Sequence, residues 1–409
     1  MSLRYIVVLP SNISSTDEAG YSKGTPIIQF SIGSQESYLI GSTVRLNGTF
    51  TRVGTNADKS MFEPSLGIYN ILSQLIISSN KTTQTIEHIH SYNRFLASYI
   101  PTTSSEDDLV GHMGVNALTG LSFSKQNINA STDFSIPLPS GILLGRNPIP
   151  LSDKWGVKGL NITIHLSPDS NVFFNNGSGA EDISGVTYTL KDLSLSAEVR
   201  VPAPDELSRL MAQSVNSFEY NSISSHYTVI NNNHATINSN IGKKRVLSVF
   251  CNFITASFLN NYSANSLETS NLRESNGDNV DITEVIFTKG GRRFPLNYDI
   301  SSVQRDYTSN DSGDGQILRN YLNSISSFSK LDRTLVSNLN TSQLTANNQP
   351  HYGVGVAYDN ISNQGVDFST DQFSMVIKST LSANNIATFI FVHAKETVLM
   401  SPQGLQVLS

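Results

Sequence analysis

Cysteine, charged side chains and long apolar runs are all scarce in this sequence. Cys251 is the one cysteine among 409 residues, which excludes an internal disulfide framework. No run approaches the roughly 20 apolar residues of a membrane-spanning helix. The stretch after Arg4, Tyr-Ile-Val-Val-Leu-Pro, is too short for the core of a signal peptide. We therefore expect a soluble protein that is synthesised in the cytosol.

Positive charge in particular is limited. Charged residues make up 15% of the chain and the formal net charge is −6, so no global basic field exists that would collect nucleic acid. Neutral Asn, Ser and Thr are abundant instead, and a surface built from them favours β-structure over Lys/Glu-rich helices. The composition therefore predicts a β-rich protein without direct sequence-specific binding of nucleic acid.

Alternation of apolar and polar residues, the period of a half-buried strand, recurs along the whole chain. It is clearest in ten segments: 25–32, 42–53, 74–79, 160–166, 187–201, 226–230, 245–259, 353–358, 373–381 and 387–400. Helical spacing is confined to three stretches, at 85–100, 204–215 and 315–325. We therefore expect an all-β fold with a few short helices.

The order of these elements repeats. Residues 74–100 predict a strand, a polar turn, a short strand and a helix, and residues 282–325 predict the same series with an added loop. The two series lie roughly 210 residues apart, about half the chain, which indicates an internal duplication. We expect two β-domains, 1–203 and 204–409, joined through a linker helix at about 204–215.

A Gly-Gly-Arg-Arg sequence at 290–293 could either hold a phosphate or form a turn. A phosphate loop should open a helix, and the nearby Pro295, directly after a phenylalanine, prevents one here. The two glycines can supply the positive φ angles that a tight hairpin needs. We predict a β-hairpin, with Arg292 and Arg293 at its end as candidate contacts to a neighbouring subunit.

His88 and His90 form a His-x-His pair like that of the metal-binding cupins, which are single-domain jelly rolls. The cupin motif also needs a glycine six residues before the first histidine and a glutamate four or five after the second. Thr82 and Arg94-Phe95 occupy those places here. The helical spacing of 85–100 would also turn the two rings about 200° apart. We therefore predict no metal or other cofactor, and histidines that are solvated or lie at a subunit interface.

No other catalytic signature occurs in the sequence. Gly353 and Gly355 lack the third glycine of a dinucleotide fingerprint, and there is no G-x-S-x-G elbow or Walker loop. The sequence at 310–315 is similar to the start of a calcium loop, but Tyr321 stands where a bidentate glutamate belongs. We do not expect an enzyme.

Seven segments resemble, in the same order, the major capsid proteins of polinton-like viruses and virophages. They are TIEHIHSYNRFLASYI (85–100), IPLPSGILLGRNPIPLS (136–152), IHLSPDSNVFF (164–174), FEYNSISSHYTVIN (218–231), VIFTKGGRRFPLNYDI (285–300), QILRNYLNSI (316–325) and NISNQGVDFST (360–370). No segment is a chemical signature. The specificity lies in their collinearity, which extends from about residue 25 to the C-terminus.

The resemblance implies a fold and an assembly. The fold would be two tandem eight-stranded antiparallel jelly rolls, and three subunits would form a pseudo-hexagonal capsomer of an icosahedral shell around double-stranded DNA. The partners would be further copies of the chain, penton and minor capsid proteins, with an internal membrane as another candidate. The protein would be made in the host cytoplasm or a viral factory and reside in the virion capsid. Arg292, Arg293, His88 and His90 would then be candidate contacts between subunits.

Two other functions remain open on the sequence. A tandem jelly-roll carbohydrate-binding or surface-adhesion protein is suggested by the β-richness and by ten Asn-x-Ser/Thr sequences. A secretion signal and clustered aromatic or carboxylate ligands would favour it. A bicupin-like enzyme is suggested by the His-x-His pair, and the failed spacing around that pair argues against it.

Overall fold

The computed structural model describes most of the chain. The described residues are 2–14, 16–62, 66–104, 131–145, 147–155, 157–175, 182–212, 216–262, 282–294, 300–301, 305–306, 311–312, 315–331, 353–359, 364–379 and 385–408. The calcium-like sequence at 310–315 lies mostly outside these ranges.

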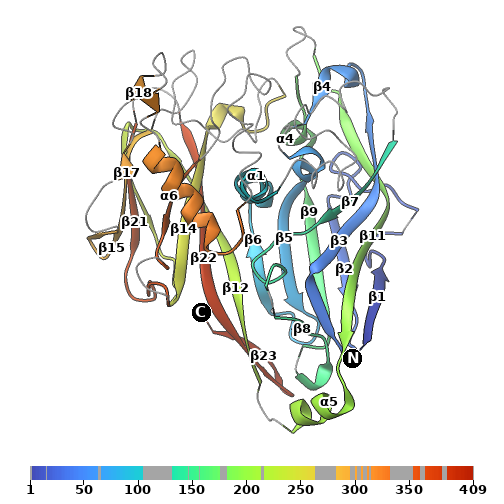
Figure 1. The fold of residues 1–409 in the computed structure, drawn as a ribbon. Coiled ribbons are helices and arrows are strands. Elements are labelled where there is room, and N and C mark those ends of the chain that lie inside the picture. The colour runs from blue at the N-terminus through green and yellow to red at the C-terminus, as the bar shows by residue number, and fades with distance from the viewer. Residues whose placement is uncertain are drawn as a thin grey trace.

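The first half of the chain forms a sandwich of two antiparallel sheets, each with four main strands (Figure 1). One sheet has the order β1-β11-β3-β7: Ser2–Val8, Thr187–Val201, Tyr38–Val53 and Ser131–Pro137. The other has the order β2-β9-β5-β6: Ile27–Ile32, Leu160–Leu166, Leu72–Ser79 and Thr85–Ile89. The short strands β4, β8 and β10 are Ser60–Met61, Ile149–Pro150 and Phe174–Asn175.

The second half builds a sandwich with the same strand order. One sheet is β12-β22-β14-β20: Asn216–Ile230, Ile386–Ser401, Val246–Thr255 and Val354–Ala357. The other is β13-β21-β15-β16: His234–Ser239, Phe373–Ser379, Ile282–Lys289 and Arg292–Phe294. The short strands β17, β18, β19 and β23 are Ile300–Ser301, Arg305–Asp306, Asp311–Ser312 and Gly404–Leu408.

In both sandwiches the first main strand pairs with the last, and the second main strand pairs with the one before the last. This pairing, of the first strand with the eighth and of the second with the seventh, is the topology of the jelly roll. The chain is therefore two tandem eight-stranded jelly rolls, and the expected fold class is confirmed.

Two of the helices, α1 and α6, occupy corresponding places in the two halves. The described helices are α1 (Tyr92–Thr103), α4 (Asp169–Val172), α5 (Pro204–Met211) and α6 (Gly315–Ser326), with one-turn helices η1 to η4 at Ala57–Lys59, Gly67–Ile71, Asp153–Trp155 and Ala256–Phe258. α1 follows β6 and α6 follows β16, so each lies between the fifth and the sixth main strand of its jelly roll. Among the described residues no helix is both long and apolar enough to span a bilayer.

The helix that the spacing of 85–100 indicates forms only in its second part. Thr85–Ile89 is the edge strand β6, which pairs with β5, as the strand-then-helix order of 74–100 predicts. Ser91 then adopts a left-handed conformation with φ of 54°, and the helix begins at Tyr92. The helical spacing before Ser91 gave a wrong prediction, because isoleucines three residues apart can also lie on the two opposite faces of a strand that is buried on both sides.

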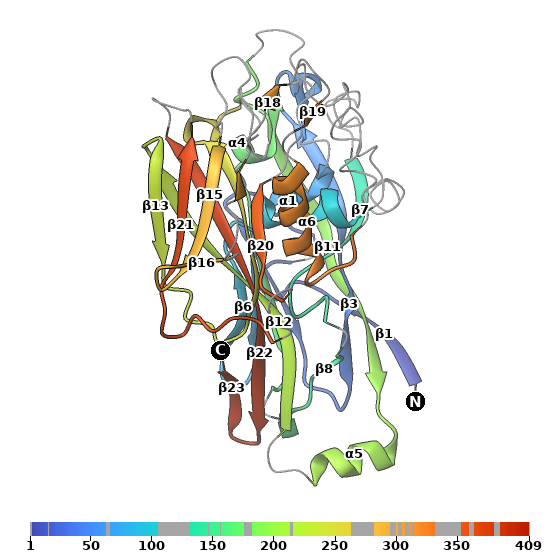
Figure 2. The same cartoon turned by 60° about the vertical axis from the view of Figure 1, so that its left-hand side comes forward.

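Each sandwich is held together by the inward face of alternating strands. In β2, for example, Ile28, Phe30 and Ile32 are buried while the residues between them are exposed. β14 is different, because all ten of its residues are buried. Its inner face fills the second sandwich, and its outer face is covered by α6 and by the first jelly roll (Figure 2).

Candidate assembly surfaces

Helix α1 of the first jelly roll packs on the outer face of the β12-β22-β14-β20 sheet. Phe95 is at the centre of this contact, with its ring centroid 5.9 Å from that of Phe391 and 6.2 Å from those of Phe250 and Phe328. Burying an aromatic ring in such a cluster stabilises by several kcal/mol, since Phe-to-Ala changes in cores cost about 3–5 kcal/mol. The two jelly rolls are therefore joined by a hydrophobic core of their own.

Specific hydrogen bonds fix how α1 sits on this sheet. The amide Nδ2 of Asn252, on the outer face of β14, donates to the backbone oxygen of Arg94 at 2.9 Å and to Ser98 Oγ at 2.8 Å. The hydroxyls of Tyr99 and Ser329 lie 3.0 Å apart on the other side of the helix. A buried polar group that keeps its partners favours one arrangement over its neighbours.

Glu87 in β6 ties three segments together. Its carboxylate accepts hydrogen bonds from the backbone amides of Gly141 (3.0 Å), Ile142 (3.1 Å) and Ile223 (2.7 Å), and the last of these belongs to β12 of the second jelly roll. The residue is 3% exposed. Burial raises the pKa of Glu87 to about 7, although the backbone and Ser140 hydrogen bonds act in the opposite direction.

A second polar contact lies beside it. The hydroxyl of Tyr220 in β12 is 2.9 Å from the backbone oxygen of Ile86 and 2.8 Å from Glu396 Oε2. Glu396 is buried and forms an ion pair with Lys243. The β6–β12 seam is thus closed by hydrogen bonds to the buried carboxyl groups of Glu87 and Glu396. The two jelly rolls are packed directly against each other.

The intramolecular contact uses one outer face from each jelly roll. Its two partners are the β2-β9-β5-β6 sheet with α1 and the β12-β22-β14-β20 sheet. The outer faces of the other two sheets, β1-β11-β3-β7 and β13-β21-β15-β16, are not used in this contact. They are the broad surfaces that the chain can present to a partner.

The outer face of β1-β11-β3-β7 carries a ladder of polar side chains that are hydrogen-bonded to one another. Arg45 Nε donates to Ser135 Oγ (2.9 Å), which donates to Asn47 Oδ1 (2.6 Å), and the Asn47 amide donates to Ser196 Oγ (3.0 Å). Thr49 with Asp133 and Thr51 with Ser131 continue the ladder. Groups that already satisfy one another cost little to remove from water.

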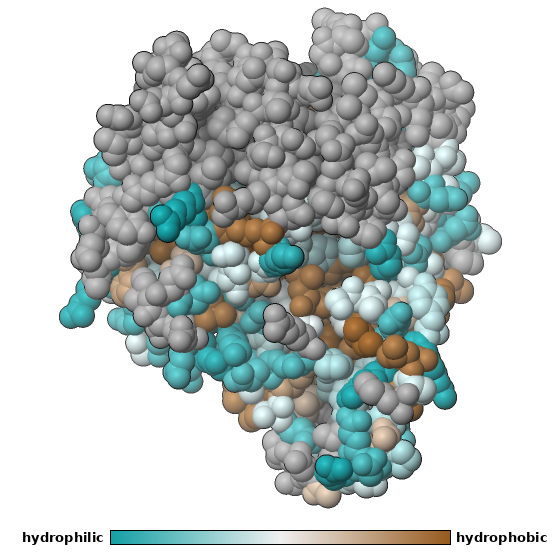
Figure 3. Space-filling model, viewed as in Figure 1, coloured by the Kyte–Doolittle hydropathy of each residue, from teal (hydrophilic) through white to brown (hydrophobic). Residues whose placement is uncertain are grey.

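The edge of that face is apolar. Leu3, Tyr5, Val7 and Leu9 are 61%, 68%, 59% and 57% exposed. The first three lie on one side of β1 and Leu9 directly follows the strand; the four are called the β1 row below. In Figure 3 apolar residues gather at the lower right of the described surface, over the region where Figure 1 shows β1 and β8. An exposed edge strand with an apolar row is a surface that proteins normally cover.

The outer face of β13-β21-β15-β16 carries charge. Lys378 on β21 pairs with Glu284 on β15 at 2.6 Å. Arg293 on β16 is the cross-strand partner of Thr288 and points to the same side, whereas Phe294 pairs with Phe287 toward the core.

The hairpin prediction for 282–300 is confirmed. β15 pairs with β16, and Lys289 is the partner of Arg292 across a two-residue turn. Both turn residues have positive φ, 51° at Gly290 and 82° at Gly291, which is the conformation of the tight turn that suits twisted strands. Arg292 and Arg293 are exposed at its end.

The predicted geometry of His88 and His90 is wrong. The two rings are not on opposite sides of a helix, because β6 is a strand and residues two apart share a face. Their centroids are 3.6 Å apart, and His88 Nε2 lies 3.3 Å from Gln74 Oε1. Burial lowers the pKa of His88 to about 4, and the electrostatic influence of His90 and His165 acts in the same direction.

Metal-binding and catalytic clusters are also limited. Within the described ranges, no group of three or more His, Cys, Asp or Glu side chains is arranged to hold a metal ion. Cys251 is buried against Met375, and burial raises the pKa of its thiol. His393 is fully buried beside the Ser327 hydroxyl (2.9 Å), and burial lowers its pKa to about 3. Both are groups of the protein interior.

Sequence reasoning missed Glu87 and the β1 row. Glu87 carries no local signal, because its partners are backbone amides far along the chain. The β1 row could have been found, since the run from Tyr5 to Leu9 is apolar on both faces, and a strand of that kind is covered on both sides.

Comparison with solved structures identifies proteins of the same fold. A chain of the PBCV-1 virus capsid superposes with a TM-score of 0.60 at 12% identity, covering 100% of this chain and 96% of that chain. A Sputnik virophage structure gives 0.59 at 11% identity, with coverage of 100% and 88%. The mavirus major capsid protein gives 0.55 at 9% identity, with coverage of 99% and 90%.

No protein-family model matches the chain, and no curated protein is detectably similar to it in sequence. The likeness to these viral proteins is therefore a likeness of fold, and it spans the whole chain. The resemblance read from the sequence is confirmed at that level.

Proposed function

We propose that this chain is a viral major capsid protein, a structural subunit of an icosahedral shell and not an enzyme. The observation that carries the proposal is the pair of jelly rolls with identical strand order. Three solved viral structures share this fold over the whole length of the chain. A shell needs broad stiff walls, and sandwiches supply them by burying both inner sheet faces. The alternative of a carbohydrate-binding or adhesion protein gains no support from these comparisons.

We further propose that the two jelly rolls are domains of residues 1–203 and 204–409, with α5 at the start of the second as the link. Every strand pairing in the described part of the chain stays on one side of α5, which supports this division. α5 lies at the lower end of both sandwiches in Figure 1, where the chain passes from one to the other.

The intramolecular contact suggests how copies associate. Within the chain, the second sheet of one jelly roll faces the first sheet of the next. Repeating this contact between copies would bring β13-β21-β15-β16 of one subunit against β1-β11-β3-β7 of its neighbour. Such a head-to-tail contact closes into a ring when its rotation is a whole fraction of a turn, and we propose a third of a turn here. Three copies would place six similar jelly rolls around the ring, with the first and the second jelly roll of each copy in alternation. This arrangement is a pseudo-hexagonal trimer.

In this arrangement the β1 row is the hydrophobic part of the subunit contact. Arg292 and Arg293 lie at the edge of the opposing sheet and are proposed as polar contacts to the neighbouring subunit. His90 is exposed beside the β6–β12 seam and is proposed as a contact to a neighbouring copy. His88 would act through its stacking on His90.

The proposed partners are further copies of the trimer, penton and minor capsid proteins, and an internal membrane, and the proposed location is the virion shell. The chain would be synthesised in the host cytoplasm or a viral factory. With a net charge of −6, it is proposed to make no sequence-specific contact with the genome.

Light scattering on the purified protein tests the subunit contact. The expected mass is three times the 44.6 kDa of one chain. The double variant Tyr5→Asp, Val7→Asp should shift the protein to monomers, because two charges would be desolvated in the contact. Leu408→Asp, at an exposed apolar residue on β23, is the matched control and should leave the trimer intact. A persistent wild-type monomer would argue against the proposal.

A further inference from the structure

The two jelly rolls close the same sheet edge in different ways. β2 and β13 hold equivalent places, each as the edge strand of the second sheet. In the first jelly roll the chain after β1 returns along the free edge of β2, where the backbone amide of Ser11 donates to the Gln29 oxygen at 2.7 Å. Asn12 adds two bonds, since its Oδ1 accepts from the Gln29 amide at 2.9 Å and its Nδ2 donates to the Ile27 oxygen at 2.8 Å. The edge of β2 is therefore covered by its own chain.

β13 has no such cover. Residues 9–26 connect β1 to β2, whereas residues 231–233 lead directly from β12 into β13. Within the described ranges, β13 pairs with β21 alone, and no hydrogen bond joins the backbone on its other side to another segment. Figure 2 shows β13 at the outer edge of its sheet. All residues of β13 except Ile237 are exposed or partly exposed. The free N–H and C=O groups of this edge are therefore open to another chain.

β13 also lacks the features that protect a free edge, which in most proteins are charged residues, a proline or a bulge. Its sequence, His-Ala-Thr-Ile-Asn-Ser, contains no proline and no residue of fixed charge. Its pairing with β21 runs without a register shift from His234 opposite Lys378 to Ser239 opposite Phe373. A regular, uncharged edge of this kind is a template on which a further strand can form.

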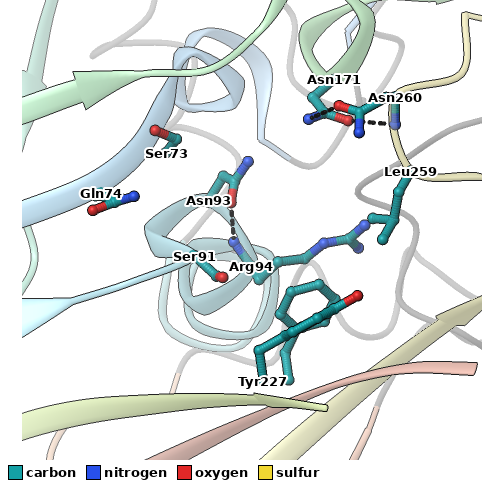
Figure 4. A pocket seen from close by; sticks show the side chains of 10 residues that line it. Ser73, Gln74, Ser91, Asn93, Arg94, Asn171, Tyr227, Leu259 and Asn260 are labelled. Atoms are coloured by element: carbon teal, nitrogen blue, oxygen red, sulfur yellow. Dashed lines mark hydrogen bonds between the residues drawn. The ribbon is translucent and has the colours of Figure 1, made fainter. Parts of the chain in front are cut away.

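A groove of about 530 Å³ lies beside this edge, between β13 and the end of β12. Figure 4 shows the cavity beside Arg94, on the other side of β12, into which Tyr227 points. Alternation along the strand therefore turns His226 and Thr228 toward the groove. His226 Nδ1 on β12 and Ser239 Oγ on β13 lie 3.4 Å apart and join its two walls. None of the described residues that line the groove is Lys, Arg, Asp or Glu.

We propose that an extended segment of another polypeptide binds in this groove as an added strand on the free edge of β13. Its backbone hydrogen-bonds to β13 as Ser11 does to β2, so recognition depends on main-chain groups. The segment is uncharged, because the neutral walls offer no partner to a charge removed from water. A single chain fits better than the edge of a second sandwich, because β12 closes the opposite side of the groove. The proposal is independent of the subunit contact, which uses outer sheet faces.

The peptide Leu-Pro-Ser-Asn-Ile-Ser, with acetylated and amidated ends, is a suitable probe for calorimetry on the full-length protein. It copies residues 9–14, which include the segment that covers β2, and it is uncharged. We expect saturable binding at one site per chain, with a Kd on the order of 1 mM or below. The same peptide N-methylated at its first serine should bind at least tenfold more weakly, because it lacks the N–H that Ser11 donates to β2. Equal binding of the two peptides, or no saturable binding of the first at about ten times that Kd, would overturn the proposal.

Proline variants locate the site. In an antiparallel strand the main-chain groups of successive residues point to opposite sides, so either Ala235 or Thr236 directs its N–H to the free edge. A proline is tolerated on an edge strand where the N–H faces outward. Of Ala235→Pro and Thr236→Pro, the one that melts near the wild-type temperature should weaken peptide binding at least tenfold. The matched control, Ala235→Ser or Thr236→Ser at the same position, keeps the N–H and should bind as the wild type does. Undiminished binding by the stable proline variant would overturn the proposal, and if both proline variants melt early, the N-methylated peptide decides alone.

Discussion

The carboxylate of Glu87 in the first jelly roll accepts a hydrogen bond of 2.7 Å from the backbone amide of Ile223 in the second. Two further amides, of Gly141 and Ile142, donate to the same side chain. One buried residue thus fixes the register of β6 against β12 and holds the loop after β7. Rigidity of the pair of jelly rolls depends on this site as well as on the Phe95 cluster.

Glu87→Ala should destabilise the protein by about 3 kcal/mol, because it leaves three buried amides without their acceptor. Denaturant unfolding at pH 5 measures this loss. Glu36→Ala is a suitable control, because its carboxylate forms an exposed pair with Lys154 (2.8 Å), and such pairs contribute less than about 1 kcal/mol. Equal losses in the two variants would show that Glu87 does not hold the seam.

The pH dependence of stability isolates the charge on Glu87. Its pKa is raised from 4.5 to about 7 in the folded chain, so its contribution to stability is fully present below pH 4.5 and is lost as the pH rises through 7. Between pH 5 and 8 the wild type should lose about 2 kcal/mol relative to Glu87→Gln. Unfolding curves of both proteins across this range check the difference. Parallel curves would contradict the raised pKa.

His393 should act in the opposite direction. Its pKa is lowered from 6.5 to about 3 by complete burial, so its contribution is present above pH 6.5 and is lost as the pH falls toward 3. From pH 8 to pH 5 the wild type should lose about 2 kcal/mol relative to His393→Asn. The same unfolding series measures it, and an identical acid response of the two proteins would rule out a neutral buried imidazole.

Variants of the hairpin around Gly290 and Gly291 measure the contribution of backbone conformation to stability separately from that of charge. A valine at Gly290 or Gly291 should cost roughly 1–3 kcal/mol, because both positions have positive φ. At Gly290 an added Cβ would also lie 3.0 Å from Asp371 Oδ1. The double variant Arg292→Gln, Arg293→Gln should melt near the wild-type temperature, since exposed charges contribute little, and assemble with a changed salt dependence. Silent valine variants beside an unstable arginine variant would contradict this division of roles.

Much of the fold follows from the sequence alone. The alternation of 160–166 and 187–201 gives the exact bounds of β9 and β11, since these strands have one buried and one less buried face. The repeated element order predicts the duplication, and the glycine pair predicts the hairpin. These signals can be read from the sequence because each depends on local backbone conformation or on burial within a single sandwich, and not on contacts between the two jelly rolls.

Other features depend on contacts between distant segments. The first part of β12, from Asn216 to Ser225, has no clear strand pattern, and two of its buried residues, Tyr220 and Ile223, are bonded to β6 of the other jelly roll. The outer face of β14 is buried by α1 and α6, so the strand lacks the expected alternation. Glu87 and the cavity beside Arg94 exist only once the two jelly rolls have met.

Electron microscopy of the purified protein is the most direct test of the proposed capsid role. Two jelly rolls from each of three copies should alternate around a ring, so class averages at micromolar concentration should show three-fold symmetric, six-lobed particles. The Tyr5→Asp, Val7→Asp variant should lose these particles while Leu408→Asp keeps them. Wild-type images of monomers, or of particles with two-fold symmetry, would contradict the capsomer and with it the proposed function.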